Sequence, residues 1–152
     1  MSLLRPEEIE RSARVAVRYL RAGVRSSRQL RAHLKARGVH AAAVNGTIAH
    51  CRRRGLLDDR AGARLWVEHL ARQGYAAAGI RLKLTAKEFG EREVDEALAR
   101  LAREAGDEAR ARELLQRKRF ISGQAGRAVR TLRARGFDDE LIERIVNDPS
   151  GD

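Results

Sequence analysis

The chain has 152 residues, of which 43% are hydrophobic and 35% charged, and its formal net charge is +11. This composition is typical of a folded globular protein rather than a disordered one, and no apolar run is long enough for a membrane span. Aromatic residues make up only 4%, and the two prolines lie near the ends of the chain. We therefore expect a mostly helical protein with an aliphatic core. A single cysteine cannot form an internal disulfide, and the N-terminus lacks the apolar run of a signal peptide, so we expect a cytoplasmic protein.

The positive charge is concentrated in the first third of the chain. Residues 1–54 carry 13 Lys and Arg against 3 Asp and Glu, whereas residues 55–106 carry 9 of each and residues 107–152 carry 10 against 9. No acidic residue occurs between Arg11 and Leu57. Arginine-rich codon usage explains arginine in place of lysine, but it does not explain the missing acids. The distribution therefore predicts a surface that faces a polyanion in this part of the chain.

The first predicted helix, over residues 8–22, carries two stripes side by side. Its arginines recur at intervals of three and four residues and, at 100° per residue, cover an arc of about 80°; they are Arg11, Arg14, Arg18, Arg21 and Arg25. An apolar set lies on the neighbouring arc and consists of Ala13, Ala16, Val17, Leu20 and Val24. We expect this helix to bury the apolar stripe and to expose five guanidinium groups beside it.

The second and third predicted helices, over residues 27–37 and 41–54, extend the basic surface. Ser26 and Gln29 have the spacing of a capping box at the start of the second helix. The further bases on these helices are Arg28, Arg31, Lys35, Arg52, Arg53 and Arg54. Guanidinium groups suit phosphate oxygens, and a face that is only solvated would carry glutamates among its bases, as the later helices do. The set predicts a surface for nucleic acid or an acidic protein groove, with affinity that falls as salt rises.

The stretch RRRGLLDDRAGARLWVEHLARQGY opens the next part of the chain, where helices are predicted over 58–73, 77–88 and 91–104. Its paired Asp58 and Asp59 could be catalytic carboxylates, but nothing else in the sequence points to a pocket around them. We therefore interpret them as caps of the following helix. Trp66 falls on the apolar stripe of that helix and is interpreted as a core residue.

No catalytic or metal-binding motif is present in the sequence. Cys51 follows Ile48 by three positions, which indicates a buried or half-buried apolar residue. The four histidines show no metal-ligand spacing with this cysteine, and there is no Gly-rich phosphate loop, nucleophile elbow or HExxH motif. We expect a protein that is not an enzyme and needs neither a cofactor nor a metal.

The last helices are predicted over 107–119, 124–135 and 139–147, and they complete a threefold repeat. The apolar positions Leu30, Leu34, Val39, Val44 and Ile48 recur 50 residues later as Ile80, Leu84, Phe89, Val94 and Leu98, and 48 residues later still as Ala128, Leu132, Phe137, Ile142 and Val146. The same shifts align Gly38, Glu88 and Gly136. One such unit is marginally stable alone, so stacked units would share an apolar seam. The sequence predicts an all-α, elongated, curved molecule of three tandem three-helix repeats, which we name the first (1–54), second (55–106) and third (107–152) units.

These residues resemble the RecX family, the regulators of the bacterial recombinase RecA. The most specific part is GLLDD at 55–59, followed by Ala63, Trp66–Val67, Gly74–Tyr75 and IRLKL at 80–84. The RGF at 135–137, with Ile142 and Val146, resembles the family's terminal repeat. Two positions depart from the family pattern. Gly62 stands where the family usually has Phe, and Gly79 stands where it often has Arg, although Arg81 keeps a base nearby.

The resemblance implies a regulator in DNA repair and recombination whose partners are the RecA filament and single-stranded and double-stranded DNA. It implies a monomer that lies along the helical groove of the filament and contacts neighbouring protomers. Strand exchange, ATP hydrolysis and cleavage of the SOS repressor would then be inhibited. The basic first unit and Arg81 would meet DNA or an acidic groove wall, while the later units would supply protein contacts and shape.

Two other functions fit the same basic surface. The chain could be a general nucleic-acid-binding module that acts without any recombinase, or a helical-repeat scaffold for an acidic protein. Binding that ignores the recombinase would favour the first alternative, and weak DNA binding with tight protein binding would favour the second.

Overall fold

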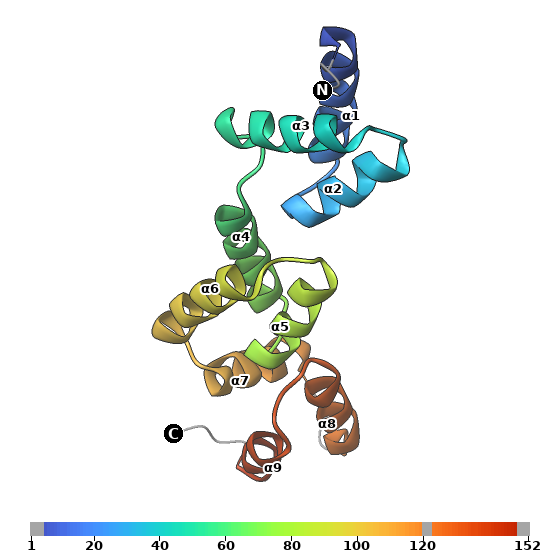
Figure 1. Cartoon of the computed structure of the whole chain (residues 1–152). Helices are drawn as coiled ribbons and strands as arrows, with labels where there is room; N and C mark the ends of the chain where they lie inside the picture. The colour runs from blue at the N-terminus through green and yellow to red at the C-terminus, as the bar shows by residue number, and fades with distance from the viewer. Residues whose placement is uncertain (1–4, 120–122, 149–152) are drawn as a thin grey trace.

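The chain folds into a succession of helices. The computed structural model describes residues 5–119 and 123–148, and over these ranges it contains nine α-helices and no strand. They are α1 (Pro6–Arg21), α2 (Ser27–Ala36), α3 (Ala41–Arg53), α4 (Asp59–Arg72), α5 (Ala77–Ala86), α6 (Glu91–Glu104), α7 (Asp107–Lys118), α8 (Ala125–Ala134) and α9 (Asp139–Asn147). Figure 1 shows them following one another down an elongated column, from α1–α3 at one end to α7–α9 at the other. The prediction of an elongated all-α fold is confirmed.

Three hydrophobic cores lie along this column, and each is built mainly from three consecutive helices. The first core takes its buried residues from α1–α3 and Leu57, the second from α4–α6 and Phe89, and the third from α7–α9, Phe137 and Ala76. Leu57 and Ala76 both come from the second unit, so the first and third cores each take a residue from their neighbour.

One backbone position has the same unusual conformation in all three units. Gly38, Glu88 and Gly136, which the repeat aligns, have φ angles of +75°, +61° and +87°. A left-handed φ favours glycine because a Cβ there approaches the following carbonyl. At Glu88 a residue with a side chain adopts it nonetheless. The turn after each unit's second helix is therefore set by the packing of the unit as well as by the residue type.

Neighbouring units are joined at the start of their second helices. Asp59, the first residue of α4, accepts hydrogen bonds from the backbone N–H and the hydroxyl of Ser27, the first residue of α2, at 2.8 and 2.6 Å. Asp107, the first residue of α7, accepts from the N–H of Ala77, the first residue of α5, at 3.0 Å. A carboxylate from the next unit thus accepts a hydrogen bond from an N–H at the positive end of α2 and of α5.

The paired aspartates therefore have different roles. Asp58 accepts a hydrogen bond from the N–H of Ala61 at 3.0 Å, so it caps its own helix as predicted. For Asp59 the prediction was wrong about the helix, because its carboxylate caps α2 of the first unit rather than α4. Trp66 lies at the same junction. It is half-buried against the second core, and its indole N–H donates to the carbonyl of Val24 at 3.1 Å.

The backbones of the second and third units approach each other closely at Gly79. A Cβ at this position would lie 2.4 Å from the carbonyl oxygen of Arg135, and a Cβ at Gly136 would lie 2.5 Å from the backbone nitrogen of Gly79. The same carbonyl accepts the N–H of Ala76 at 3.0 Å. A side chain fits at neither glycine unless a backbone moves. An arginine at position 79 would therefore disrupt this junction, which gives the departure from the family pattern a physical reason.

Gly62 is the other departure from the family pattern, and the space beside it is occupied by neighbouring side chains. Gly62 is buried within α4, and a Cβ there would lie 3.2 Å from the ring of Phe89 and 3.2 Å from the side chain of Val24. These two side chains occupy the space that an aromatic residue at position 62 would need. An aromatic side chain at position 62 would therefore require Phe89 and Val24 to move.

Candidate functional site

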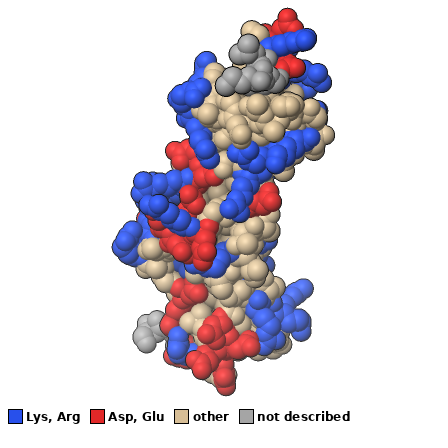
Figure 2. All heavy atoms as spheres, viewed as in Figure 1, with Lys and Arg blue, Asp and Glu red and all other residues tan. Residues whose placement is uncertain are grey.

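Four of the five predicted stripe arginines keep the predicted arrangement on α1. Arg11, Arg14, Arg18 and Arg21 are all exposed. The first unit contains three carboxylates, and all of them precede the stripe, at Glu7, Glu8 and Glu10. Over residues 5–119 and 123–148 none of the eight ion pairs includes a base of the first unit. In Figure 2 the carboxylates on the visible face gather mainly over the middle and lower parts of the molecule, where they alternate with bases.

Arg25 does not belong to this stripe, which corrects the prediction. α1 ends at Arg21, and Arg25 lies in the loop that follows, with its guanidinium 4.7 Å from the ring centroid of Tyr19. Tyr19 in turn stacks on His33, with the ring centroids 4.0 Å apart. The Nε of Arg25 is buried and has no hydrogen-bond partner in the described part of the chain. Arg25 is therefore mainly a packing residue over Tyr19.

The buried face of α1 also differs from the predicted one. Ala16 is fully buried, as predicted, but the neighbouring buried residue is Ser12, whose hydroxyl lies 2.6 Å from that of Thr47. Val17 is only partly buried, and Val24 lies beyond the end of the helix and is 38% exposed. The predicted apolar stripe therefore runs along the edge of the buried face, beside the arginines, instead of through its centre.

The bases on α2 and α3 differ in their exposure and in their contacts. Arg31 donates a hydrogen bond to the side chain of Asn45 at 2.6 Å. Arg28 and Lys35 are exposed. Arg52 and Arg53 are exposed in the last turn of α3, where a positive charge also stabilises the helix dipole.

Arg81 is paired. Its guanidinium lies 2.7 Å from the carboxylate of Asp95 on α6. Arg31 and Asn45 occupy the same positions in the first unit, 50 residues earlier, so this link between second and third helices recurs. Both Arg81 and Asp95 are largely exposed, so the pair is worth at most about 1 kcal/mol. Of the twelve predicted site residues, Arg81 has the clearest structural role.

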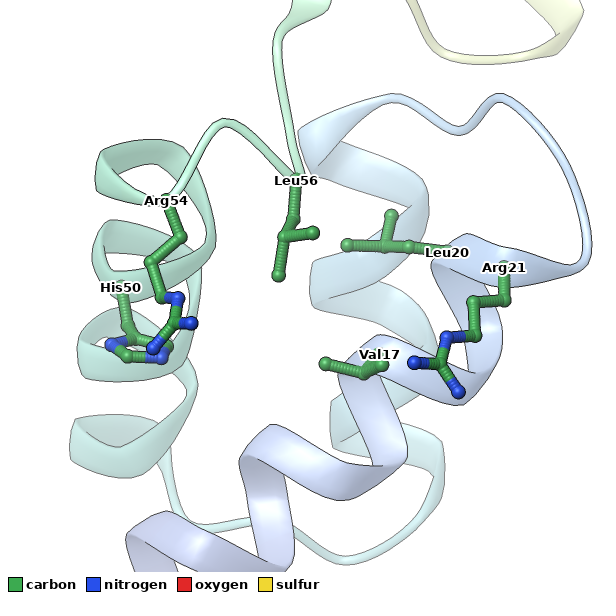
Figure 3. Close-up of a pocket in the computed structure, with 6 residues that line it drawn as sticks. All are labelled: Val17, Leu20, Arg21, His50, Arg54 and Leu56. Atoms are coloured by element: carbon green, nitrogen blue, oxygen red, sulfur yellow. The ribbon is translucent and has the colours of Figure 1, made fainter.

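Arg21 and Arg54 lie on opposite sides of a hollow between α1 and α3. It has a volume of about 500 Å³ and is lined by Val17, Leu20, Arg21, His50, Arg54 and Leu56. Figure 3 shows Val17, Leu20 and Leu56 toward the space between the helices, with His50 and Arg54 on the α3 side. A shallower hollow shares Val17 and Arg21 and adds Arg14 and Arg18. The apolar residues of the hollow, Val17, Leu20 and Leu56, thus lie beside the arginines.

Comparison with the second unit explains why these apolar residues are partly exposed. Val67 and Leu70 of α4 correspond to Val17 and Leu20, yet they are only 2% and 4% exposed. In the second unit Leu101 on α6 packs in the core with them. The corresponding residue of the first unit, 50 positions earlier, is the much smaller Cys51. The first unit therefore leaves partly uncovered a face that the second unit buries.

Several residues at this surface were missed by the sequence analysis. Arg37 and His40 line a hollow together with Arg11, and His50 and Leu56 line the α1–α3 hollow. Arg37 falls outside the regular spacing of the stripe, so nothing in the sequence indicated it as a binding residue. His50 precedes Arg54 by four residues, which places both on one face of α3, and this spacing could have identified it.

Two titratable groups in the first unit have shifted pKa values. Burial, followed by the charges of Arg37 and Arg25, lowers the pKa of His33, whose ring stacks on Tyr19. Burial raises the pKa of the Cys51 thiol, which is fully buried, as predicted. A buried protonated thiol is a poor nucleophile.

The described residues contain neither a metal-binding cluster nor a helix that could span a membrane. Within them no group of His, Cys, Asp and Glu side chains is placed to hold a metal ion. Nor does any helix among residues 5–119 and 123–148 combine the length and the apolar character needed to cross a bilayer. The surface of the first unit is therefore the strongest candidate for function.

Comparison with solved structures gives a clear likeness of fold. The crystal structure of RecX from Lactobacillus salivarius superposes with a TM-score of 0.74 over 95% of this chain and 97% of that one, at 17% sequence identity. A crystal structure of regulatory protein RecX superposes with a TM-score of 0.69 over 97% of this chain and 80% of that one, at 20% identity. No protein-family model and no curated protein matches the sequence. The chain has the fold of the RecX crystal structures.

Proposed function

We propose that this chain is a RecX-type regulator that binds the RecA–DNA filament and inhibits it without catalysis of its own. The observation that carries the proposal is the likeness of fold, which extends over nearly the full length of both this chain and the Lactobacillus salivarius RecX. The motif order from GLLDD at 55–59 to RGF at 135–137 supports the same family. Inhibition would extend to strand exchange, ATP hydrolysis and cleavage of the SOS repressor, and it would take place in the cytoplasm.

The shape and charge of the molecule suit this role. An elongated monomer can follow a helical groove and touch several protomers. The α1 arginines have no carboxylate partner in the described structure, so they remain available to phosphates or acidic side chains. The α1–α3 hollow places apolar side chains beside these charges. Such a surface suits a protein–DNA assembly, in which both phosphates and protein side chains are presented.

Charge reversal on α1 tests the proposal. The substitutions Arg14→Glu, Arg18→Glu and Arg21→Glu, made together in the full chain, should weaken binding to recombinase filaments on single-stranded DNA by about tenfold or more. The reason is that each lost rim contact is worth roughly 0.5–1 kcal/mol, and each reversed charge adds repulsion. Binding is measured by surface plasmon resonance on filaments held together with a non-hydrolysable ATP analogue.

A matched control changes the total charge equally. Arg103, Arg127 and Arg130 are exposed and form no ion pair in the described part of the chain. Their replacement by glutamate should leave most of the filament affinity, and circular dichroism should show all variants folded. If the α1 variant and the control bind alike, the stripe is not a specific contact and this part of the proposal is wrong.

A general nucleic-acid-binding module remains a second candidate, because the unpaired α1 arginines would serve it equally well. It predicts that bare single-stranded DNA and the filament bind with the same affinity at equal salt. The filament proposal predicts tighter binding to the filament.

A further inference from the structure

A second cationic cluster lies where the second and third units meet. Nζ of Lys83 lies 4.9 Å from the ring centroid of Tyr75, and the guanidinium carbon of Arg135 lies 5.0 Å from the same centroid. A hollow of about 400 Å³ at this junction is lined by Gln73, Tyr75, Leu114, Arg117, Lys118 and Arg135. Four bases from α5, α7 and the end of α8 thus gather around one tyrosine, although they are far apart in the sequence.

The net charge of the second and third units is close to zero, so the sequence did not indicate this basic cluster. All eight ion pairs among the described residues lie in the second and third units, and none includes one of its four bases. Glu113 precedes Arg117 by four residues on α7 but is not paired with it. The carboxylates that do form ion pairs in these units bind other arginines; Glu108, for example, binds both Arg112 and Arg144 at 3.1 Å. The cluster's charge is therefore available to a polyanion.

The tyrosine is held in place from the third unit. The carbonyl of Tyr75 accepts a hydrogen bond at 3.2 Å from Nε of Arg110, which is only 7% exposed. Arg135 donates to the carbonyl of Gln73. Gly74 packs so closely on α7 that a Cβ there would lie 2.8 Å from Cδ1 of Leu114. Because the backbone that carries the ring is held before binding, a ligand does not have to order this segment, which lowers the cost of binding.

We propose that Tyr75, Lys83, Arg117, Lys118 and Arg135 form a binding site for single-stranded nucleic acid. A base would stack on the tyrosine ring once the Lys83 side chain, which is exposed, moves aside. Neighbouring phosphates would meet Arg117, Lys118 and Arg135. An aromatic face among cations is the usual means of binding single strands without sequence preference. A duplex keeps its bases stacked and cannot use the ring in this way.

This site is distinct from the α1 stripe and needs no recombinase. Figure 1 places α5, α7 and α8 well down the column from α1. Its test therefore uses nucleic acid alone: fluorescence anisotropy of a labelled oligothymidylate with the full chain. The background protein carries Arg14→Glu, Arg18→Glu and Arg21→Glu, so that binding through the stripe does not hide the junction.

In this background, Arg117→Glu with Lys118→Glu should weaken binding by about tenfold or more. The slope of log affinity against log salt should become shallower by about 1.4, because each phosphate contact on a single strand contributes about 0.7. Arg127→Glu with Arg130→Glu is the matched control: it makes the same charge change at exposed positions of α8 outside the hollow. The control should cost much less affinity.

Two substitutions of the tyrosine separate stacking from charge. Tyr75→Phe keeps the ring and should bind like the background, whereas Tyr75→Leu should weaken binding about fivefold or more, because stacking of one base is worth roughly 1–3 kcal/mol. Duplex DNA should not distinguish the two. The proposal is overturned if the background protein does not bind, if the Arg117 and Lys118 pair costs no more than the control, or if the Tyr75→Phe and Tyr75→Leu proteins bind the single strand alike. None of these results would bear on filament inhibition, which is measured with the recombinase.

Discussion

Glu88 combines an ordinary side chain with a backbone conformation that favours glycine. Its φ is +61°, and the aligned residues of the other two units are Gly38 and Gly136. A left-handed residue other than glycine costs about 1–2 kcal/mol. Since Glu88 is exposed and makes no ion pair among the described residues, little in the structure offsets this cost.

Replacing Glu88 with glycine should therefore raise the free energy of unfolding by about 1 kcal/mol, after part of the gain is lost to the flexibility of glycine in the unfolded chain. Urea denaturation followed by circular dichroism measures the change. The reverse substitution, Gly38→Ala, should lower the free energy of unfolding by a similar amount. A Glu88→Gly protein that is less stable than the wild type would show that the glutamate makes a contact that outweighs the strain.

His33 makes the stability of the first unit depend on pH. Its folded-state pKa is lowered by burial and by Arg37 and Arg25, so below its ordinary value of 6.5 the unfolded chain binds a proton more readily than the folded one. Stability should thus be highest above that value and fall as the pH drops. His33→Phe keeps an aromatic ring on Tyr19 but cannot be protonated.

Thermal unfolding between about pH 7 and about pH 5.5 tests this account, because that window spans the ordinary histidine pKa. The wild-type protein should lose more stability over the window than His33→Phe. The other three histidines are present in both proteins, so their contributions cancel in the comparison. Equal losses in the two proteins would rule out His33 as the source.

At the scale of the helices, close packing of backbones joins the second and third units. A Cβ at Gly79 would lie 2.4 Å from the carbonyl oxygen of Arg135, so Gly79→Ala must push α8 away from α5. We expect this substitution to lower the free energy of unfolding by about 1–3 kcal/mol, as overpacking does. Hydrogen exchange should become faster in α8 and at the start of α5.

Gly46 provides the matched control for this substitution. It lies within α3, and a Cβ there would meet nothing within 4 Å. Gly46→Ala should therefore raise the free energy of unfolding by about 0.5–1 kcal/mol through helix propensity alone. If both alanine variants are equally stable, the close approach at Gly79 does not limit the packing of the units.

The helices could be predicted closely from the sequence, whereas the surfaces between them could not. Apolar spacing places α5 over 77–88, and the structure has it over Ala77–Ala86, because buried Ile80 and Leu84 determine the face that packs. The α1–α3 hollow depends on the difference in size between Cys51 and Leu101. The Tyr75 cluster depends on how the third unit docks, which no local pattern encodes. The charge of α1 could be predicted because its arginines lie on one helix.

At the scale of the whole molecule, charge and shape are arranged along the same axis. The unpaired α1 arginines lie toward one end of the column, and the bases around Tyr75 lie in its other half. Between them some carboxylates are paired with arginines, as Glu96 is with Arg60 at 3.1 Å. An elongated protein with separated basic surfaces suits a partner that presents phosphates over a distance, as a nucleoprotein filament does.

The most direct test of this account measures ATP hydrolysis by the recombinase of the same bacterium. The protein is titrated into reactions that contain single-stranded DNA in fixed excess. Our account predicts inhibition at well below one protein per recombinase monomer, because each bound molecule acts on the filament and not on free DNA. No inhibition, or inhibition only when the protein saturates the DNA, would contradict it and would indicate a basic helical protein that competes for phosphates.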